Sequence, residues 1–396
     1  MRVAMLMAAA GSRVGGLETI AREFAAALAA RGHTVTLVTG VGPGARLHRD
    51  LRDGQAPYRV RTVPMLGQGS WPARLLGRMR GAHPSIVEAR TFWAVARRRP
   101  AIRRELQGSQ VVAAFFEVEA VAASRELAVP VVYYYPGAID ARRLARGRFA
   151  RMIAISHMVA DHYTGMRAGM DLPPIDGVVP PGIRAEWIAV GPAPGVTADP
   201  PEAIFSGRLD WPGPKRAEKL VEWWPQVQAA VPGARLTLIG DGTQRAALQQ
   251  AVADAGLTDV VYLPGASPHD ALLARLRTAS LYVFPSQFET FGIAPLEALA
   301  AGLPVLASDI PALRESLGEA AWLLPVDDDA AWVAALIRLL RDPVLRREWA
   351  AKGPAHARGF TWDAQAAAYE AHLLAAAGLE SGDSAARTAR RSAHQV

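Results

Sequence analysis

The chain of 396 residues contains no cysteine, so disulfide bonds and thiolate metal sites are excluded. This fits a reducing compartment, and we expect a cytoplasmic protein. Long apolar runs are missing too: no stretch reaches the roughly 18 to 20 apolar residues that a membrane-spanning helix needs. The apolar run at residues 1–10 is short, and a pattern with helical spacing follows it at once. We therefore predict a buried first strand there and no signal peptide.

Lysine is scarce, since all but three of the 44 basic residues are arginines. Residues 1–190 hold 26 arginines and 14 acidic residues, a net charge of about +12, whereas residues 191–396 carry about −5. Arginine is densest at residues 74–83 and 96–105. Three interpretations remain open: a solvated surface, a face for anionic lipid or an anionic acceptor, and nucleic-acid binding. No helix-turn-helix, RNP or zinc pattern supports the last, so we predict no nucleic-acid partner and keep peripheral contact with an anionic membrane as a hypothesis.

Short apolar runs alternate with amphipathic helical patterns along most of the chain. This alternation is typical of an α/β fold with doubly wound parallel sheets, and the length indicates two domains. Residues 191–202 are rich in proline and glycine and lack periodicity, which indicates a linker. We therefore predict Rossmann-like domains at residues 1–190 and 191–360. Residues 379–396 are small, polar and aperiodic, which predicts a disordered tail.

The segment QFETFGIAPLEALAAG, residues 287–302, follows an apolar run that we interpret as a buried strand. Pro295 lies where a helix would begin and Gly302 where it would end, which predicts a helix over residues 294–301. The turn that leaves a strand of a parallel sheet lies at the carboxyl edge of that sheet, where ligands bind. The segment is therefore a candidate binding loop.

Two glutamates lie on either side of this turn. Glu289 is in the turn and Glu297 in the first turns of the helix, so both carboxylates can face one crevice. Between them, the backbone N–H groups of Phe291, Gly292 and Ile293 lie at a helix N-terminus, which suits a phosphate. A diphosphate flanked by two hydroxyl-rich rings, as in a sugar nucleotide, fits this order of groups. The alternative is an ordinary surface glutamate followed by one that complements the helix dipole.

Other loops at the same sheet edge carry cations and glycines. Arg208 and Lys215 follow the apolar run at residues 203–207 and can neutralise a diphosphate leaving group; the alternative is a solvated pair. Gly240, in LIGDG, permits close approach of the backbone to a bound donor.

The first half of the chain contains a second glycine loop. Gly15 and Gly16 directly precede a helical pattern and can contact phosphate from the opposite domain. The spacing is not G-x-G-x-x-G, so a dinucleotide fingerprint is poorly matched. No Asp-x-Asp triplet or histidine cluster offers a metal site in the linker or the loops of the second half.

Taken in this order, GRLD with its following lysine, LIGDG and PSQFETFGIAPLEALAAGLPVLASD resemble the retaining glycosyltransferases of family four, which have the GT-B fold. GGLETIAREFAAALAARGHTVTLVT resembles the first helix and second strand of the family. FTWD, near Phe360, resembles the start of its last helix. The resemblance covers most of residues 1–375. It implies two Rossmann-like domains that face a central cleft, and a helix at residues 361–378 that returns to the N-terminal domain.

The resemblance also implies a role for individual residues. Arg208 and Lys215 would stabilise the departing diphosphate, Glu289 would bind hydroxyls of the transferred sugar, and Glu297 would bind the ribose. Contacts with phosphate or sugar are implied for a further set: Gly15, Gly16, Phe291, Gly292 and Ile293. Neither a metal nor a cofactor is implied, and the expected donor is a UDP- or GDP-linked sugar.

One departure from the family concerns the acceptor. Family members commonly carry His-Gly or His-Asp after the strand written here as VPVVYYYPG, and Pro136 occupies the histidine position. The hydroxyl of Tyr135 can substitute as a hydrogen-bond donor. Glu117 and Glu119 directly follow a predicted strand and are further candidates for contact with the acceptor, which can be a glycan, a lipid-linked molecule or a small molecule.

We therefore expect an enzyme of the hexosyltransferase type that transfers a sugar from a nucleotide-sugar donor with retention of configuration. Two alternatives remain: a non-catalytic, nucleotide-sugar-binding partner subunit, and a sugar-nucleotide epimerase of the same fold. A phosphorylase of the glycogen type would need a pyridoxal lysine, and no lysine of this sequence lies in such a setting. Release of a nucleoside diphosphate only when an acceptor is added separates the first function from the two alternatives.

Overall fold

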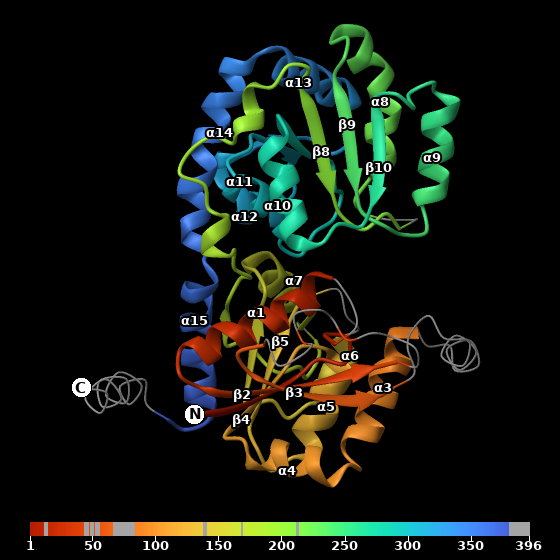
Figure 1. Ribbon diagram of the computed structural model, residues 1–396. Helices are drawn as coiled ribbons and strands as arrows, with labels where there is room; N and C mark the ends of the chain where they lie inside the picture. The colour runs from red at the N-terminus through yellow and green to blue at the C-terminus, as the bar shows by residue number, and fades with distance from the viewer. Residues whose placement is uncertain are drawn as a thin grey trace. The chain divides into compact units, whose positions relative to one another are not determined.

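The computed structural model of the chain (Figure 1) describes residues 1–11, 15–42, 47, 51, 56–65, 84–137, 141–167, 169–210 and 214–379. The chain divides into two compact units, each with its own sheet. Unit 1 contains Met1–Pro181 together with Trp362–Val396, and unit 2 contains Gly182–Thr361. The division falls at Gly182, nine residues before the linker that the composition predicts.

Unit 1 is built on a seven-stranded parallel sheet of order β3-β2-β1-β4-β5-β6-β7. Its strands are β1 Arg2–Leu6, β2 Thr34–Val41, β3 Arg59–Pro64, β4 Val111–Ala114, β5 Val131–Tyr135, β6 Arg151–Ala154 and β7 Gly177–Val178. Its helices are α1 Gly16–Ala30, α3 Pro84–Ala96, α4 Pro100–Gly108, α5 Glu117–Glu126, α6 Ala141–Leu144, α7 His157–Arg167 and α15 Trp362–Ala376. The order reverses between β1 and β4, so the crevice at their carboxyl ends is the expected ligand site of this sheet.

The last helix, α15, belongs to the core of unit 1. Phe24 of α1 and Tyr134 of β5 contact Tyr369 of α15, with ring centroids 4.7 and 5.8 Å away. His33, which follows α1, is buried and bonds through Nε2 to Oε1 of Glu370 at 2.5 Å. These contacts bury aromatic surface from both ends of the chain, which accounts for the return of the helix to the first unit. The predicted tail from residue 380 onward lies outside the described residues.

Unit 2 is built on a six-stranded parallel sheet of order β10-β9-β8-β11-β12-β13. Its strands are β8 Glu202–Ser206, β9 Arg235–Ile239, β10 Val261–Gly265, β11 Leu281–Phe284, β12 Val305–Ser308 and β13 Trp322–Leu324. Its α-helices are α8 Ala217–Ala230, α9 Arg245–Asp254, α10 His269–Thr278, α11 Ile293–Ala300, α12 Pro311–Leu317, α13 Asp329–Arg341 and α14 Pro343–Ala357. Both units therefore have the doubly wound α/β architecture, and the predicted fold class is confirmed.

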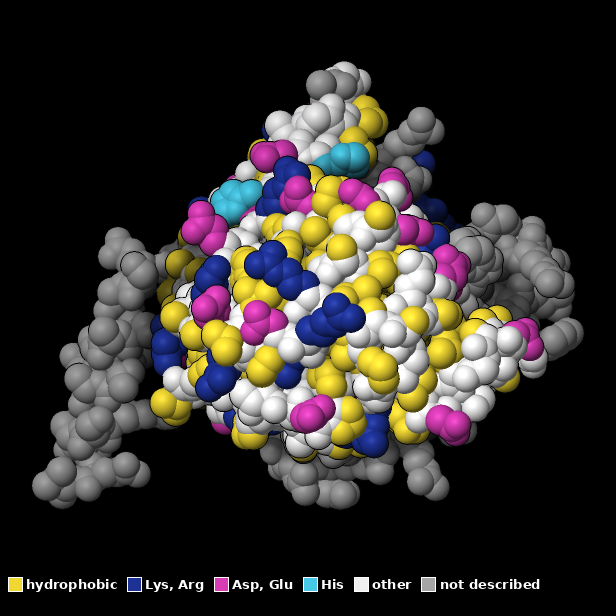
Figure 2. All heavy atoms as spheres, turned by 90° about the horizontal axis from the view of Figure 1, so that it is seen from above, with side chains coloured by type: hydrophobic (Ala, Val, Ile, Leu, Met, Phe, Trp, Pro, Cys, Tyr) yellow, Lys and Arg dark blue, Asp and Glu magenta, His cyan; other side chains and the backbone are white. Residues whose placement is uncertain are grey.

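The surface carries charges of both signs. On the face shown in Figure 2, basic and acidic side chains lie close to one another among apolar ones. Among the described residues, no helix is long and apolar enough to cross a membrane. The arginine-rich segment at residues 74–83 lies outside the described residues, whereas that at residues 96–105 is described and lies around the start of α4.

Candidate functional site

The candidate site of unit 2 lies where the strand order reverses. β8 and β11 are neighbours in the sheet, with Ile204 opposite Tyr282, yet they are separated by two other strands in the sequence. In an open parallel sheet the loops after two such strands diverge to opposite faces, which leaves a crevice at their carboxyl ends. The loop after β8 carries Arg208 and Lys215, and the loop after β11 carries Glu289.

Lys215 and Glu289 form the centre of this site. The Nζ atom of Lys215 makes an ion pair with Oε1 of Glu289, and the lysine lies over the ring of Phe284, 5.0 Å from its centroid. The lysine side chain is 23% exposed and the glutamate side chain 10%, so the pair is largely withdrawn from water but can still be reached. The structure thus brings together a cation and a carboxylate that are 74 residues apart in the sequence.

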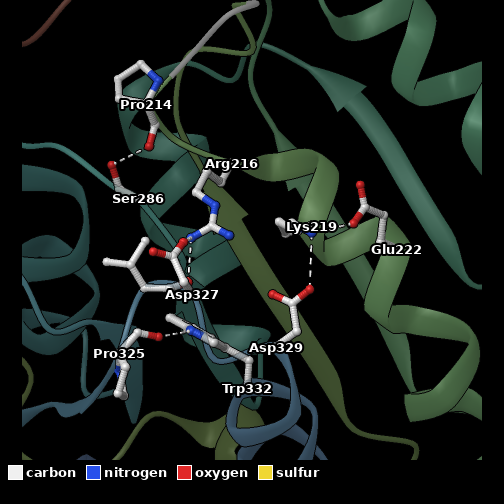
Figure 3. Close-up of polar contacts among 10 residues, drawn as sticks. Pro214, Arg216, Lys219, Glu222, Ser286, Pro325, Asp327, Asp329 and Trp332 are labelled. Atoms are coloured by element: carbon white, nitrogen blue, oxygen red, sulfur yellow. Dashed lines mark hydrogen bonds and ion pairs between the residues drawn. The ribbon is translucent and has the colours of Figure 1, made fainter.

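The backbone on either side of Lys215 is fixed by contacts that the sequence does not suggest. The carbonyl oxygen of Pro214 accepts hydrogen bonds from the Ser286 hydroxyl at 2.9 Å and from the Gln287 N–H at 2.7 Å. Arg216, which Figure 3 shows beside Asp327, follows Lys215 in the left-handed conformation, with φ of 54°. Its buried guanidinium donates to the carbonyl of Val326. These two contacts hold the loop after β8 against the segments that follow β11 and β13.

Arg208 lies on the same loop but is not clamped in this way. Its side chain is 73% exposed, and its guanidinium pairs with Asp210 at 3.2 Å. An exposed ion pair of this kind is weak, because both charges remain hydrated. The guanidinium can therefore leave Asp210 for a ligand at little cost.

Gly240 has a packing role. A Cβ atom at this position would lie 1.8 Å from the carbonyl oxygen of Gly207, in the loop that carries Arg208. The backbones of these loops also bond directly, from Gly207 N to Ile239 O at 3.0 Å and from Leu209 N to Asp241 O at 3.0 Å. The close backbone approach at Gly240 is thus an approach to the neighbouring loop.

The N-terminus of α11 lies at the same edge. Gly292 is the N-cap, with φ of 95°, and a Cβ atom there would lie 2.4 Å from Leu313, so only glycine fits. Phe291 directs its ring inward against Phe360, with centroids 5.8 Å apart, which leaves its backbone for contact with a ligand. The helix begins at Ile293, one residue before the predicted start. N–H groups of the first turn lack intrahelical partners and favour an anion.

Glu297 is in the second turn of α11 and is partly exposed. Burial raises the pKa of the Tyr282 hydroxyl above its usual range, and the nearby charges of Glu297 and Glu289 raise it further. Both carboxylates therefore lie within electrostatic reach of one residue of β11.

The predicted residues of unit 1 also lie at a strand-order reversal, between β1 and β4. Gly15 is the N-cap of α1, in an extended conformation that any residue adopts, and Gly16 begins the helix. Tyr135 ends β5 and is buried, and no described residue makes a hydrogen bond with its hydroxyl. Gly15, Gly16 and Tyr135 lie toward the carboxyl edge of the sheet, where they were predicted, but the ring of Tyr135 is buried.

The two carboxylates after β4 are buried as well. Glu117 pairs with Arg143 at 2.7 Å, and Glu119 accepts the N–H of Ala8 at 2.8 Å. Burial raises the pKa of Glu119 to about 8, and the charge of Glu88 adds to this effect. Contact of these side chains with an acceptor would require unit 1 to open, which the sequence gives no means to foresee.

No group of three or more histidine, aspartate or glutamate side chains among the described residues is arranged to hold a metal ion. The positive charge at the site of unit 2 comes from Lys215, Arg208 and the N-terminus of α11.

Two different family models match the two halves of the chain. The model "Glycosyltransferase Family 4" matches residues 14–187, and the model "Glycosyl transferases group 1" matches residues 192–356. A phosphatidyl-myo-inositol mannosyltransferase of Mycobacterium leprae is 36% identical over 162 residues, which are 40% of this chain and 42% of that protein. A D-inositol 3-phosphate glycosyltransferase of Acidothermus cellulolyticus is 31% identical over 232 residues, 53% of this chain and 51% of that protein. The chain spans about half the length of these curated relatives.

Solved structures extend the likeness of fold to nearly the whole chain. A sucrose-phosphate synthase from Thermosynechococcus elongatus has a TM-score of 0.70 at 20% identity, over 93% of this chain and 97% of that one. The Anabaena protein HepE, solved with UDP and glucose, has a TM-score of 0.69 at 18% identity, over 95% of this chain and 100% of that one. At such identities the likeness establishes the fold alone.

Proposed function

Because the chain belongs to glycosyltransferase family 4, matched over residues 14–187 and 192–356, we propose that it transfers a sugar from a nucleotide-sugar donor to an acceptor with retention of configuration. The observation that carries the proposal is the ion pair of Lys215 and Glu289 at the strand-order reversal of unit 2. In this pair, Lys215 is the group for the departing phosphate and Glu289 is the group for the transferred sugar.

The diphosphate requires positive charge, since negative charge builds up on it as the sugar–phosphate bond breaks. Lys215, Arg208 and the N–H groups at the start of α11 supply this charge at one sheet edge. Preorganised donors of this kind stabilise a transition state more than a ground state, because they need no reorganisation as the charge develops. We propose that neither a metal nor a cofactor is needed.

The two carboxylates serve the hydroxyl groups on either side of the diphosphate. Glu297 accepts hydrogen bonds from the ribose, and Glu289 accepts them from the transferred sugar. When the donor binds, Lys215 moves its charge toward the phosphate, and Glu289 is released to the sugar hydroxyls. After the exchange the lysine is paired with the phosphate and the carboxylate accepts hydrogen bonds from the sugar hydroxyls, which avoids the cost of leaving either charge buried without a partner.

Retention follows from attack on the face that the leaving group occupies. The acceptor oxygen forms a bond to the anomeric carbon as the bond from that carbon to the phosphate oxygen breaks. The acceptor proton passes to the same phosphate oxygen, so atoms and charge balance without a protein base. Glu289 holds the sugar and does not form a covalent intermediate.

The donor proposed is a UDP- or GDP-linked sugar. The names of the two curated relatives compared above give inositol-bearing acceptors. The acceptor of the mannosyltransferase is lipid-linked, and that of the glycosyltransferase is a small phosphate. An acceptor of either kind, or a glycan, is compatible with this chain. Peripheral contact with an anionic membrane is part of the proposal only for a lipid-linked acceptor.

The experiment that tests the function has two stages. Thermal shift with UDP-, GDP- and ADP-sugars identifies the donor, and nucleoside diphosphate release is then measured with and without candidate acceptors. Release that depends on the acceptor, with a product of retained configuration by NMR, is the expected result. Activity that a chelator abolishes, inverted product, or a donor converted without any acceptor would contradict the proposal.

A further inference from the structure

Unit 1 has a hollow of about 610 Å³ on the edge of its sheet opposite the carboxyl edge. Its lining comes from the end of α3 with the residues after it, from α4, and from the end of α5. In the chain, α4 leads into the amino end of β4 and α5 into that of β5 (Figure 1). Trp93, Leu106 and Leu127 form its apolar side. The volume is in the range of about 300–1,000 Å³ that is common for small-molecule pockets.

The polar side of the hollow is strongly basic. Arg97, Arg98 and Arg103 line it, and Glu126 is the one acidic residue in the lining, which leaves a net charge of +2. Arg97 pairs with Glu126 at 3.4 Å, but both side chains are more than 40% exposed, so this pair is weak. Arg98 and Arg103 make no ion pair with any residue that the structure describes.

Helix electrostatics explain only part of this arrangement. A cation beside the C-terminus of α3 complements the helix dipole, which accounts for Arg97 and Arg98. Arg103 lies inside α4, four residues after its N-cap Arg99, where a cation gains nothing from the dipole. In addition, Trp93 is 5% exposed, and its Nε1 atom makes no hydrogen bond with any residue that the structure describes. A buried N–H group without a partner is uncommon in a native protein.

We propose that this hollow binds a phosphomonoester, with the phosphate held by Arg97, Arg98 and Arg103 and the attached apolar group against Trp93, Leu106 and Leu127. The dianion of a phosphomonoester matches the net charge of the lining, and the planar forks of arginine match phosphate oxygens. The same chemistry occurs in a soluble phosphorylated metabolite and in a phosphomonoester lipid headgroup. The site is independent of the proposed transfer reaction, which belongs to the sheet edge of unit 2.

The test uses the full chain and two soluble probes, phenyl phosphate and inorganic phosphate, titrated by calorimetry. The double variant Arg98→Glu/Arg103→Glu removes the unpaired cations. Arg104→Glu is the matched control, because Arg104 is exposed on the same helix but does not line the hollow. Thermal melting and the affinity of each variant for nucleoside diphosphate verify that both units are folded.

We expect phenyl phosphate to bind more tightly than inorganic phosphate, and the double variant to weaken it at least about tenfold, as for the loss of a charged hydrogen bond. Arg104→Glu should change the affinity less than about twofold. Equal loss of phenyl phosphate affinity in the control and the double variant overturns the proposal, as does failure of phenyl phosphate at about 1 mM together with failure of the vesicle experiment below.

A second experiment distinguishes a lipid headgroup from a soluble metabolite as the source of the phosphate. Sedimentation with phosphatidic acid vesicles, and with phosphatidylcholine vesicles as reference, tests the lipid headgroup. A membrane ligand is identified if the protein binds phosphatidic acid vesicles but not phosphatidylcholine vesicles, and if Arg98→Glu/Arg103→Glu abolishes this binding. Binding of phenyl phosphate without vesicle binding identifies a soluble one, and failure in both arms overturns the site.

Discussion

Arg216 offers the sharpest test of how the site is held together, because it neighbours Lys215 and its conformation is unusual. A non-glycine residue in the left-handed region costs about 1–2 kcal/mol. The buried guanidinium offsets this cost with its hydrogen bond to the carbonyl of Val326. A hydrogen bond of a charged group contributes about 1.5–3 kcal/mol. The two effects nearly cancel, so the residue fixes the loop without adding much to stability.

Two substitutions separate the two effects. Arg216→Gly removes the hydrogen bond and the strain together, so we expect the free energy of unfolding to fall by only about 1 kcal/mol. Arg216→Ala removes the hydrogen bond and keeps the strain, so we expect a fall of about 2–3 kcal/mol. Urea unfolding measures both. Equal stability of the two variants would contradict the strain argument.

The turnover of the two variants shows whether Lys215 is still held in position. In both variants the backbone after Lys215 loses its anchor, while the anchor at Pro214 remains. Because a displacement of about 1 Å can cost about a hundredfold in rate, we expect turnover to fall about 10- to 100-fold, with a smaller change in KM for the donor. Lys219→Ala is the control: its side chain, in the first turn of α8, pairs with Glu222 of the same helix and with Asp329 of α13, as Figure 3 shows. Wild-type turnover in Arg216→Ala would refute the role of Arg216.

Three further predictions concern single residues. Lys215→Ala should lower turnover about 10²–10³-fold in a donor-saturated assay, as for loss of a preorganised oxyanion donor; a change below tenfold would count against it. Glu297→Ala should weaken nucleoside diphosphate binding by about 1–3 kcal/mol in calorimetry, because ribose hydroxyls lose their acceptor, and unchanged affinity would exclude the ribose contact. Burial raises the pKa of Glu119 to about 8 from 4.5, so the folded state binds more protons than the unfolded state between these values. Stability should therefore fall by up to roughly 5 kcal/mol from pH 4.5 to 8 and then level off. This slope should be missing in Glu119→Gln, and parallel profiles would refute the assignment.

Most strands could be predicted from the sequence because their apolar runs are bounded by turn residues and buried on both faces. Two strands of unit 1 lack such a run. β3 is an edge strand whose Arg59 and Arg61 are exposed and both pair with Glu105, so it lacks an apolar run. β7 has only two residues. Edge and very short strands depend on the neighbouring strand rather than on their own composition, which is why periodicity fails to find them.

The site could be predicted in part, because glutamates and cations after strands mark the carboxyl edge of a parallel sheet. That rule places Lys215 and Glu289 at one sheet edge, but it does not specify the ion pair between them. The anchors at Ser286 and Arg216 could not be predicted, since serine is common in loops and a left-handed backbone is a signal for glycine, not arginine. Only the folded loop shows that this arginine reaches a carbonyl after β13.

The residues predicted for the acceptor side bear on the mechanism through their burial. Burial raises the pKa of the Tyr135 hydroxyl, so its anion is disfavoured. Glu119, with a pKa of about 8, is mostly protonated at neutral pH, and Glu117 is already paired with Arg143. Deprotonation of the acceptor therefore gains little from these three groups, and Pro136 has no side chain that could replace the histidine of the family. An oxygen of the departing diphosphate can take the proton of the acceptor hydroxyl instead, because the basicity of this oxygen rises as the sugar–phosphate bond breaks. The burial that disfavours a protein base in unit 1 is thus the physical argument for same-face attack in the proposed reaction.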